Sequence, residues 1–132
     1  MPRSCWRIRA AVIAACLSLA AAGISASAAP VRLKTAEISA TLSGNTVIGT
    51  WNTTEFRQYF DAGGSTVYVP RSGSPASGQW RANNDLYCSI WPPAGSESCY
   101  TLMRDGDTLI WQATDGGSPH PSTLVKGKAL SW

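Results

Sequence analysis

The sequence predicts an all-β fold, a small antiparallel up-and-down barrel of seven or eight strands with one short N-terminal helix. Short runs of alternating apolar and polar residues indicate strands. Gly-, Asn- and Asp-rich turns separate these runs at hairpin distance. No segment is long enough for the helical crossover that parallel strands need, so the sheet is expected to be antiparallel. Closing it into a barrel would remove its exposed edges.

The strongest hairpin signals lie in residues 78–113. Asn83-Asn84 and Asp105-Gly106 tolerate the left-handed backbone that two-residue turns require. Two-residue turns at these positions would place Trp80 opposite Tyr87 and Leu102 opposite Leu109. The hairpin between them turns through residues 92–95, and regular pairing there would place Cys88 opposite Cys99.

These registers align four aromatic side chains across four strands, and we take them as the candidate ligand-binding residues: Trp80, Tyr87, Tyr100 and Trp111. The opposite face of the strands is more polar, so the aromatic face is assigned to the interior. Plain core packing is the favoured interpretation of the row, because buried aromatic residues usually only pack.

The first 28 residues predict a signal peptide. Arg3, Arg7 and Arg9 precede an apolar run over 10–24, and Ala-Ser-Ala at 26–28 matches a cleavage site. Cleavage is expected after Ala28, which leaves residues 29–132 as a single periplasmic or secreted barrel domain. The apolar run is too short for a transmembrane helix, so no stable membrane insertion is expected after cleavage.

A lipoprotein signal is the alternative interpretation of this leader. Ile-Ala-Ala-Cys at 13–16 resembles a lipoprotein cleavage site, which would anchor the chain through Cys16. Only six apolar residues separate Cys16 from Arg9, and the apolar run continues beyond it, so anchoring is less favoured. The mass of the mature N-terminus would decide between the two.

Charge and cysteine content narrow the function classes further. The chain has 11 Lys and Arg residues and 8 Asp and Glu residues. Three of the arginines and none of the acids lie in the leader, so residues 29–132 are formally neutral and show no nucleic-acid footprint. Cys88 and Cys99 are the cysteines that remain after export, and a disulfide between them is predicted. Two cysteines and one distant histidine do not make a metal site.

The flanking segments are expected to complete the barrel. Thr35 would cap a helix whose Ile38 and Leu42 share one face. We further expect a loose arm at 29–34, strands at 47–51, 56–60, 65–69 and 123–130, a loop at 70–77 that is a candidate gate, and Trp132 as a plug of the core.

No catalytic set is visible in the sequence. His120 lies between two prolines in a predicted loop and is expected to be solvated, without a nucleophile motif beside it. Most carboxylates fall in predicted turns, where Asp is favoured for backbone reasons. Asp105-Gly106-Asp107 lacks the later ligands of a calcium loop, and no nucleotide motif is present. A non-enzymatic protein without a cofactor is therefore predicted.

The residues resemble a recurrent pattern of short, secreted bacterial proteins of unknown function. Its most specific part is Cys-Ser-Ile-Trp-Pro at 88–92 followed by Cys99-Tyr100; 42–49, Tyr59-Phe60 and Gly78-Gln79-Trp80 also contribute. This resemblance implies export, one disulfide and a β-rich domain, and it brings no assigned activity.

A looser resemblance is to lipocalin-like barrels, through Gly49-Thr50-Trp51, and to the secreted metalloprotease inhibitors built on such a barrel. We therefore expect a binding module for a small molecule, a glycan or a protein. The alternative is a protease inhibitor that uses its N-terminal arm or the 70–77 loop, although the arm at 29–34 is short for this role. An enzyme with a pair of turn carboxylates ranks third.

Overall fold

A computed structural model of the protein describes Gly23 and residues 28–132; most of the predicted signal peptide, including Cys16, lies outside these residues. Eight antiparallel strands, β2 to β9, form a closed barrel, and each pairs with the next strand in the chain. Pairing of β2 with β9 closes the ring. The predicted fold class is confirmed.

The elements follow one another with short connections. They are β1 (Val31–Arg32), α1 (Thr35–Leu42), β2 (Asn45–Trp51), β3 (Thr54–Phe60), β4 (Ser65–Pro70), β5 (Ala76–Asn83), β6 (Leu86–Ile90), β7 (Glu97–Asp105), β8 (Thr108–Ala113) and β9 (His120–Val125).

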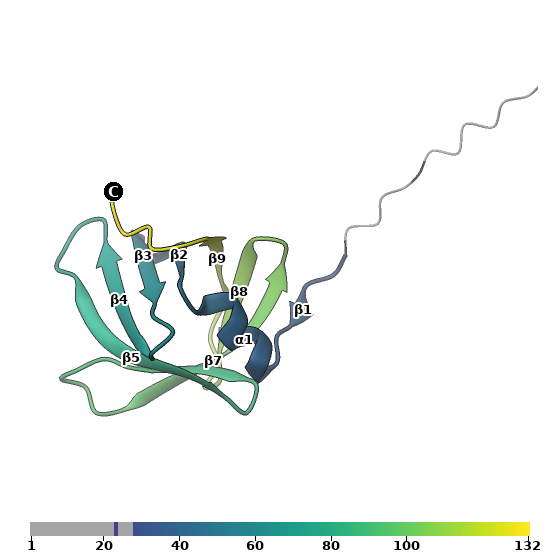
Figure 1. Cartoon of the computed structure of the whole chain (residues 1–132), viewed down its shortest axis with the longest axis horizontal. Helices are drawn as coiled ribbons and strands as arrows, with labels where there is room; N and C mark the ends of the chain where they lie inside the picture. Colours follow the sequence, from purple (N-terminus) through teal and green to yellow (C-terminus); the bar gives the residue numbers. More distant parts are fainter. Residues whose placement is uncertain (1–22, 24–27) are drawn as a thin grey trace, which may run out of the picture.

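The up-and-down order gives the barrel two different ends (Figure 1). The turns at 61–64, 84–85 and 106–107 lie at one end, together with α1. We call this the closed end. The turns at 52–53, 71–75, 91–96 and 114–119 lie at the other, which we call the open end. The loop predicted at 70–77 spans only 71–75, because Pro70 belongs to β4 and residues 76–77 belong to β5, and it borders the open end.

The segment before α1 is bound to the barrel, so the prediction of a loose arm at 29–34 is wrong for residues 31–34. Val31 and Arg32 pair with Arg104 and Met103 of β7. The backbone N–H of Leu33 donates to Leu102 O at 2.8 Å, and the Leu33 side chain is buried. β7 extends beyond β6, and β1 pairs with this extension.

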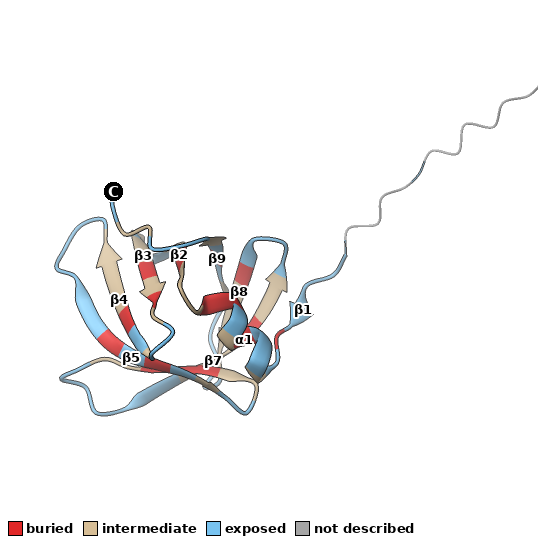
Figure 2. Ribbon diagram, in the orientation of Figure 1, coloured by how far each residue is buried: buried red, intermediate tan, exposed pale blue. Residues whose placement is uncertain are grey.

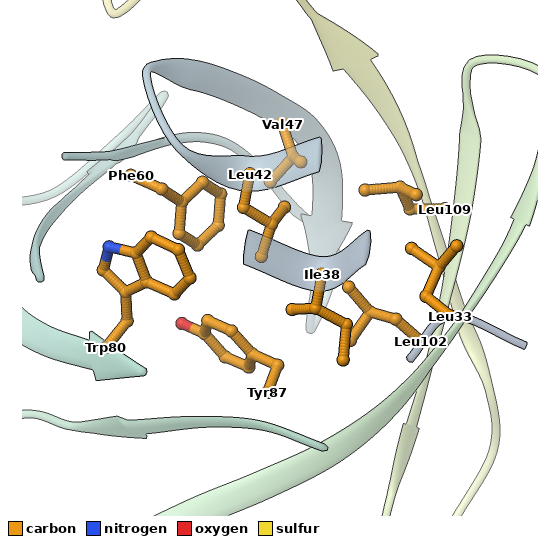
Figure 3. Close-up of a cluster of buried hydrophobic side chains, with 9 residues drawn as sticks. All are labelled: Leu33, Ile38, Leu42, Val47, Phe60, Trp80, Tyr87, Leu102 and Leu109. Atoms are coloured by element: carbon orange, nitrogen blue, oxygen red, sulfur yellow. The ribbon is translucent and has the colours of Figure 1, made fainter. Parts of the chain in front are cut away.

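Helix α1 closes its end of the barrel with an apolar face (Figure 3). Ile38 and Leu42 are fully buried and point into a cluster with residues from the strands, as their spacing predicted. Buried residues occur on α1 and along the strands of the barrel (Figure 2). The remaining members of the cluster are Leu33, Val47, Phe60, Trp80, Tyr87, Leu102 and Leu109.

Helix α1 begins one residue earlier than predicted, and Thr35 is not its cap. Lys34 is the N-cap residue, and its backbone N–H donates to Glu37 Oε2 at 2.7 Å. The Thr35 N–H donates to the carboxylate of Asp85 at 2.9 Å. Gly44 takes a left-handed conformation after the helix, at φ 75°.

Two of the predicted registers are displaced by two residues. The turns lie at Asn84-Asp85 and Gly106-Asp107, each one residue later than predicted, so Trp80 faces Ser89 and Leu102 faces Trp111. Because side chains alternate with a period of two, this shift keeps each aromatic residue on the predicted interior face. The four aromatic side chains therefore share one face but are staggered along the strands, and do not lie directly opposite one another on all four.

The middle hairpin has the predicted register. Cys88 pairs with Cys99 and Tyr87 with Tyr100. The disulfide between Cys88 and Cys99 is present, on the outer face of the sheet. Disulfides persist in oxidising compartments, in agreement with a periplasmic or extracellular location.

The C-terminal segment lies on the outer wall, so the prediction that Trp132 plugs the core is wrong. The last strand ends at Val125, earlier than predicted, and Gly127 turns the chain at φ 79°. Residues 126–132 then run along β2 and β3, and we call them the tail. The Trp132 ring stays exposed, with the guanidinium groups of Arg57 and Arg71 each 4.9 Å from its centroid.

Candidate functional site

The open end of the barrel encloses a cavity of about 420 Å³. Its floor is the core that α1 closes, and its mouth lies between the four loops of the open end. Aromatic side chains dominate the lining. The lining residues are Val47, Trp51, Phe56, Gln58, Tyr68, Ala76, Tyr87, Ser89, Trp91, Ser98, Tyr100, Trp111 and His120.

One wall of the cavity is built from Phe56, Tyr68 and Trp91. The Phe56 and Tyr68 rings stack with their centroids 4.9 Å apart. Trp91 follows the end of β6 and meets Tyr68 edge to face at 6.2 Å. Its indole N–H donates to Ser89 Oγ at 3.1 Å, which fixes the direction of the ring.

A second wall is built from Tyr87, Tyr100 and Trp111. Trp111 stands nearly perpendicular to both tyrosine rings, at interplanar angles of 86° and 82° and centroid distances of 5.0 and 6.3 Å. The Trp111 indole N–H donates to Ser122 Oγ at 2.7 Å. This hydrogen bond satisfies a partly buried donor within the protein and holds the ring in place without a ligand.

Trp51 and His120 form the third aromatic group, at the mouth. Their ring centroids are 4.6 Å apart. His120 is the first residue of β9, pairs with Trp111 and lies on the cavity wall. The prediction that His120 lies in a loop is therefore wrong, and its side chain is half-buried. Trp51 stays 41% exposed, so its ring is accessible at the cavity mouth.

Two glycines make room for these rings. A Cβ on Gly78 would lie 2.6 Å from Ile90 O and 2.8 Å from the Trp91 ring. A Cβ on Gly49 would lie 3.0 Å from the Phe56 ring. Both glycines sit where a strand side chain would point inward, so their absent side chains let the rings lie against the barrel wall.

A small polar group lies in the cavity floor. The Gln58 amide donates to Thr66 Oγ1 at 3.0 Å and to the Tyr87 hydroxyl at 3.1 Å. Burial raises the pKa of Tyr87 to about 12, although hydrogen bonds with Ser89 and Gln58 act in the opposite direction. The floor is therefore polar but uncharged at neutral pH.

The electrostatics of the upper cavity depend on tyrosines and one acid. Burial raises the pKa of Tyr68. Burial, and then the negative charge of Asp115, raise the pKa of Tyr100. No Asp, Glu, Lys or Arg side chain is among the lining residues. This arrangement can bind a molecule by burial and ring contacts, and it offers no carboxylate pair for acid–base chemistry.

Three of the four predicted binding residues line the cavity, and Trp80 does not. Tyr87, Tyr100 and Trp111 belong to its second wall. Trp80 lies at the closed end, 7% exposed, and its indole N–H donates to Asp61 O at 2.9 Å. Trp80 therefore belongs to the core.

Sequence reasoning missed the other ten lining residues, and five of these carry aromatic rings: Trp51, Phe56, Tyr68, Trp91 and His120. All of these five except Trp91 lie outside the central hairpins at 78–113. Phe56 and Tyr68 each lie in a predicted strand. Their two-residue alternation with buried neighbours is the signal that points to the interior.

The described residues hold one cluster of metal-ligand type, formed by Cys88, Cys99 and Glu97. Both sulfur atoms are joined in the disulfide, so no thiolate is free to bind a metal. Glu97 accepts two hydrogen bonds from the Arg81 guanidinium, at 2.8 and 2.6 Å. The cluster therefore consists of the Arg81–Glu97 ion pair next to the Cys88–Cys99 disulfide.

None of the described helices has the length and apolarity to cross a membrane.

No protein-family profile, no curated protein and no solved structure matches this chain.

Proposed function

We propose that this protein is an exported binding module that holds a small organic molecule in the cavity at the open end of its barrel. The observation that carries the proposal is an aromatic cavity of about 420 Å³ with a mouth formed by loops. Ligand pockets in proteins are concave, mostly apolar and largely preformed, at roughly 300–1,000 Å³. At about 30 Å³ per water, this volume corresponds to on the order of fifteen water-sized groups.

The rigidity of the walls supports binding. The indole groups of Trp91 and Trp111 are each fixed by a hydrogen bond to a serine within the barrel. A ligand therefore does not have to order these side chains when it binds, and this lowers the entropic cost of association.

Export and the absence of catalysis are part of the same proposal. The predicted signal peptide and the disulfide favour a periplasmic or secreted protein. His120 lines the cavity, and no lining carboxylate accompanies it as a partner for acid–base chemistry. Protease inhibition by the N-terminal arm gains no support, because residues 31–33 are paired with β7.

Two substitutions in neighbouring positions of β5 test the proposal. Both residues are exposed, but Ala76 lines the cavity and Ser77 points to the opposite face of the strand. Ala76→Phe is expected to obstruct the cavity, and Ser77→Phe adds the same side chain outside it. Tryptophan fluorescence is titrated with a panel of small aromatic, aliphatic and glycan compounds, in a Trp132→Phe background that removes the indole on the outer wall.

The expected result is a saturable response to at least one compound, abolished by Ala76→Phe and kept by Ser77→Phe. Loss of the response in both variants, or in neither, would place binding elsewhere. A flat response of the parent protein to the whole panel would contradict the proposal.

A further inference from the structure

The class of ligand can be narrowed, given the proposed function. We infer that the cavity prefers a weakly hydrated organic cation, such as a quaternary ammonium compound, over a neutral molecule of the same shape. The inference rests on the kind of side chains at the open end, the directions of their rings, and the distribution of charge around the mouth.

Aliphatic and aromatic residues are segregated along the barrel axis. The buried leucines and isoleucine belong to the closed-end core, as with Ile38, Leu42 and Leu102. The cavity lining contains only Val47 and Ala76 as aliphatic residues. A site that binds by apolar burial alone has no need for this bias, because aliphatic side chains contribute to burial equally well.

The rings meet the cavity from several directions. Trp111 is almost perpendicular to Tyr100, and Trp91 is almost perpendicular to Tyr68, at interplanar angles of 82° and 78°. A bound group would therefore meet both faces and edges of rings on more than one side. The face of an aromatic ring carries negative potential, and cages of such faces bind quaternary ammonium groups.

The charge around the mouth favours the same class. At the open end, Glu55 is paired with Arg71 at 3.1 Å, and Glu97, at the start of β7, is paired with Arg81. Among the described residues, no ion pair involves Asp115, in the 114–119 loop at the mouth. Its charge acts on the lining residue Tyr100, whose pKa it raises in addition to the effect of burial.

Three probes of matched size and shape test the inference. They are 3-hydroxyphenyltrimethylammonium, its neutral isostere 3-tert-butylphenol, and the anion 3-hydroxybenzenesulfonate. Isothermal titration calorimetry measures the affinity of residues 28–132 for each probe at neutral pH. The cation is expected to bind roughly tenfold more tightly than the neutral isostere, and the anion most weakly.

Two pairs of variants separate ring contacts from long-range charge. Trp111→Leu and Tyr100→Leu keep an apolar wall without the ring faces. They should lower the affinity for the cation more than the affinity for the neutral isostere. Asp115→Asn should lower the affinity for the cation a few-fold, and high salt should remove this difference by screening the charge. Asp107→Asn makes the same charge change in a turn at the closed end, and should leave the affinity unchanged.

The outcomes distinguish the two proposals. Equal or tighter binding of 3-tert-butylphenol, or tightest binding of the sulfonate, would overturn the cation preference and leave the binding proposal intact. Equal losses for cation and isostere in both leucine variants would also overturn the preference. Failure of all three probes, together with the wider panel, would overturn the proposed function itself.

Discussion

Asp85 and Thr35 hold each other across 50 residues of sequence, through three hydrogen bonds. Asp85 Oδ1 accepts from the Thr35 N–H at 2.9 Å and from the Thr35 hydroxyl at 3.1 Å. The Asp85 N–H in turn donates to Thr35 Oγ1 at 2.8 Å. These bonds join the start of α1 to the turn between β5 and β6, so they hold the helix that closes the barrel.

This contact predicts an acid-sensitive helix attachment. The backbone hydrogen bond from Thr35, more than any other contact, lowers the pKa of Asp85. A carboxylate with a lowered pKa in the folded state contributes stability above its unfolded pKa, and this is lost as pH falls through the folded value. Asp85→Asn should therefore reduce the unfolding midpoint at neutral pH and flatten its fall in acid.

Thermal unfolding followed by circular dichroism at a series of pH values measures this effect. Asp107→Asn removes an acid from another turn of the closed end and is the matched control. If the Asp85 and Asp107 variants have the same pH profile, the contact does not link α1 to protonation.

The glycine beneath Trp91 carries the second prediction. Gly78→Ala would bring a methyl group within 2.6 Å of a backbone oxygen and 2.8 Å of the Trp91 ring. Overpacking of this kind costs about 1–3 kcal/mol, because the backbone cannot yield easily. The variant should be less stable, and Trp91 should move within the cavity.

Chemical denaturation and the NMR signal of the Trp91 indole N–H report the two effects. Gly95→Ala is the control, because a Cβ there meets no atom within 4 Å. Gly49→Ala should cost less than Gly78→Ala, since its nearest contact is the end of the Phe56 side chain. Comparable stability of the Gly78 and Gly95 variants would show that Trp91 does not depend on the missing side chain.

The hairpin turns predicted the barrel because each strand pairs with its sequence neighbour. Turns misplaced by one residue still put Trp80 and Tyr87 on one face, since the resulting register shift was two residues. The cavity was harder to predict. Trp91 follows its strand, and it lies inside the barrel only because Gly78, on a neighbouring strand, leaves space for it.

His120 and Gln58 show two other limits of the sequence pattern. Prolines flank His120 and indicate a loop, yet this end of β9 pairs with β8 and not with β2, so the missing N–H of Pro121 is tolerated. Gln58 is polar but 9% exposed, because its amide is bonded to Thr66 and Tyr87. From the sequence alone, a polar side chain in a strand predicts an outward-facing position.

Tyr87 predicts a loss of stability in strong alkali. Burial raises its pKa from 10.0 to about 12. A pKa raised in the folded state gives stability that is present below the unfolded value and lost as pH rises through the folded one. Stability should thus decline between pH 10 and 12, by up to about 3 kcal/mol for two pKa units.

Absorbance of the phenolate and denaturant midpoints across this range check the prediction. Tyr87→Phe removes the titrating group, so its stability should decline less steeply with pH than that of the parent. If the parent and the phenylalanine variant lose stability in parallel, another group governs alkaline unfolding.

The last prediction concerns the tail: the buried Thr46 hydroxyl should contribute more to its attachment than the large Trp132 ring. Thr46 is on the outer face of β2 but fully buried, because the tail covers it. Its hydroxyl donates to Gly127 O at 2.7 Å and accepts from the Ala129 N–H at 2.9 Å. Thr46→Val keeps the shape but leaves two tail groups without partners, at a cost of about 1–3 kcal/mol.

Trp132→Ala should cost less than about 1 kcal/mol, because the ring is 45% exposed and cation–π contacts such as those with Arg57 and Arg71 are weak at exposed sites. Thr50→Val, on the same face of β2 and exposed, is the control for the hydroxyl. Denaturant unfolding gives the energies, and hydrogen exchange of the Ala129 amide shows whether the tail detaches. If Trp132→Ala lowers the free energy of unfolding more than Thr46→Val does, the ring rather than the hydroxyl holds the tail. In that case the contacts of the ring would contribute more than the two buried hydrogen bonds of Thr46.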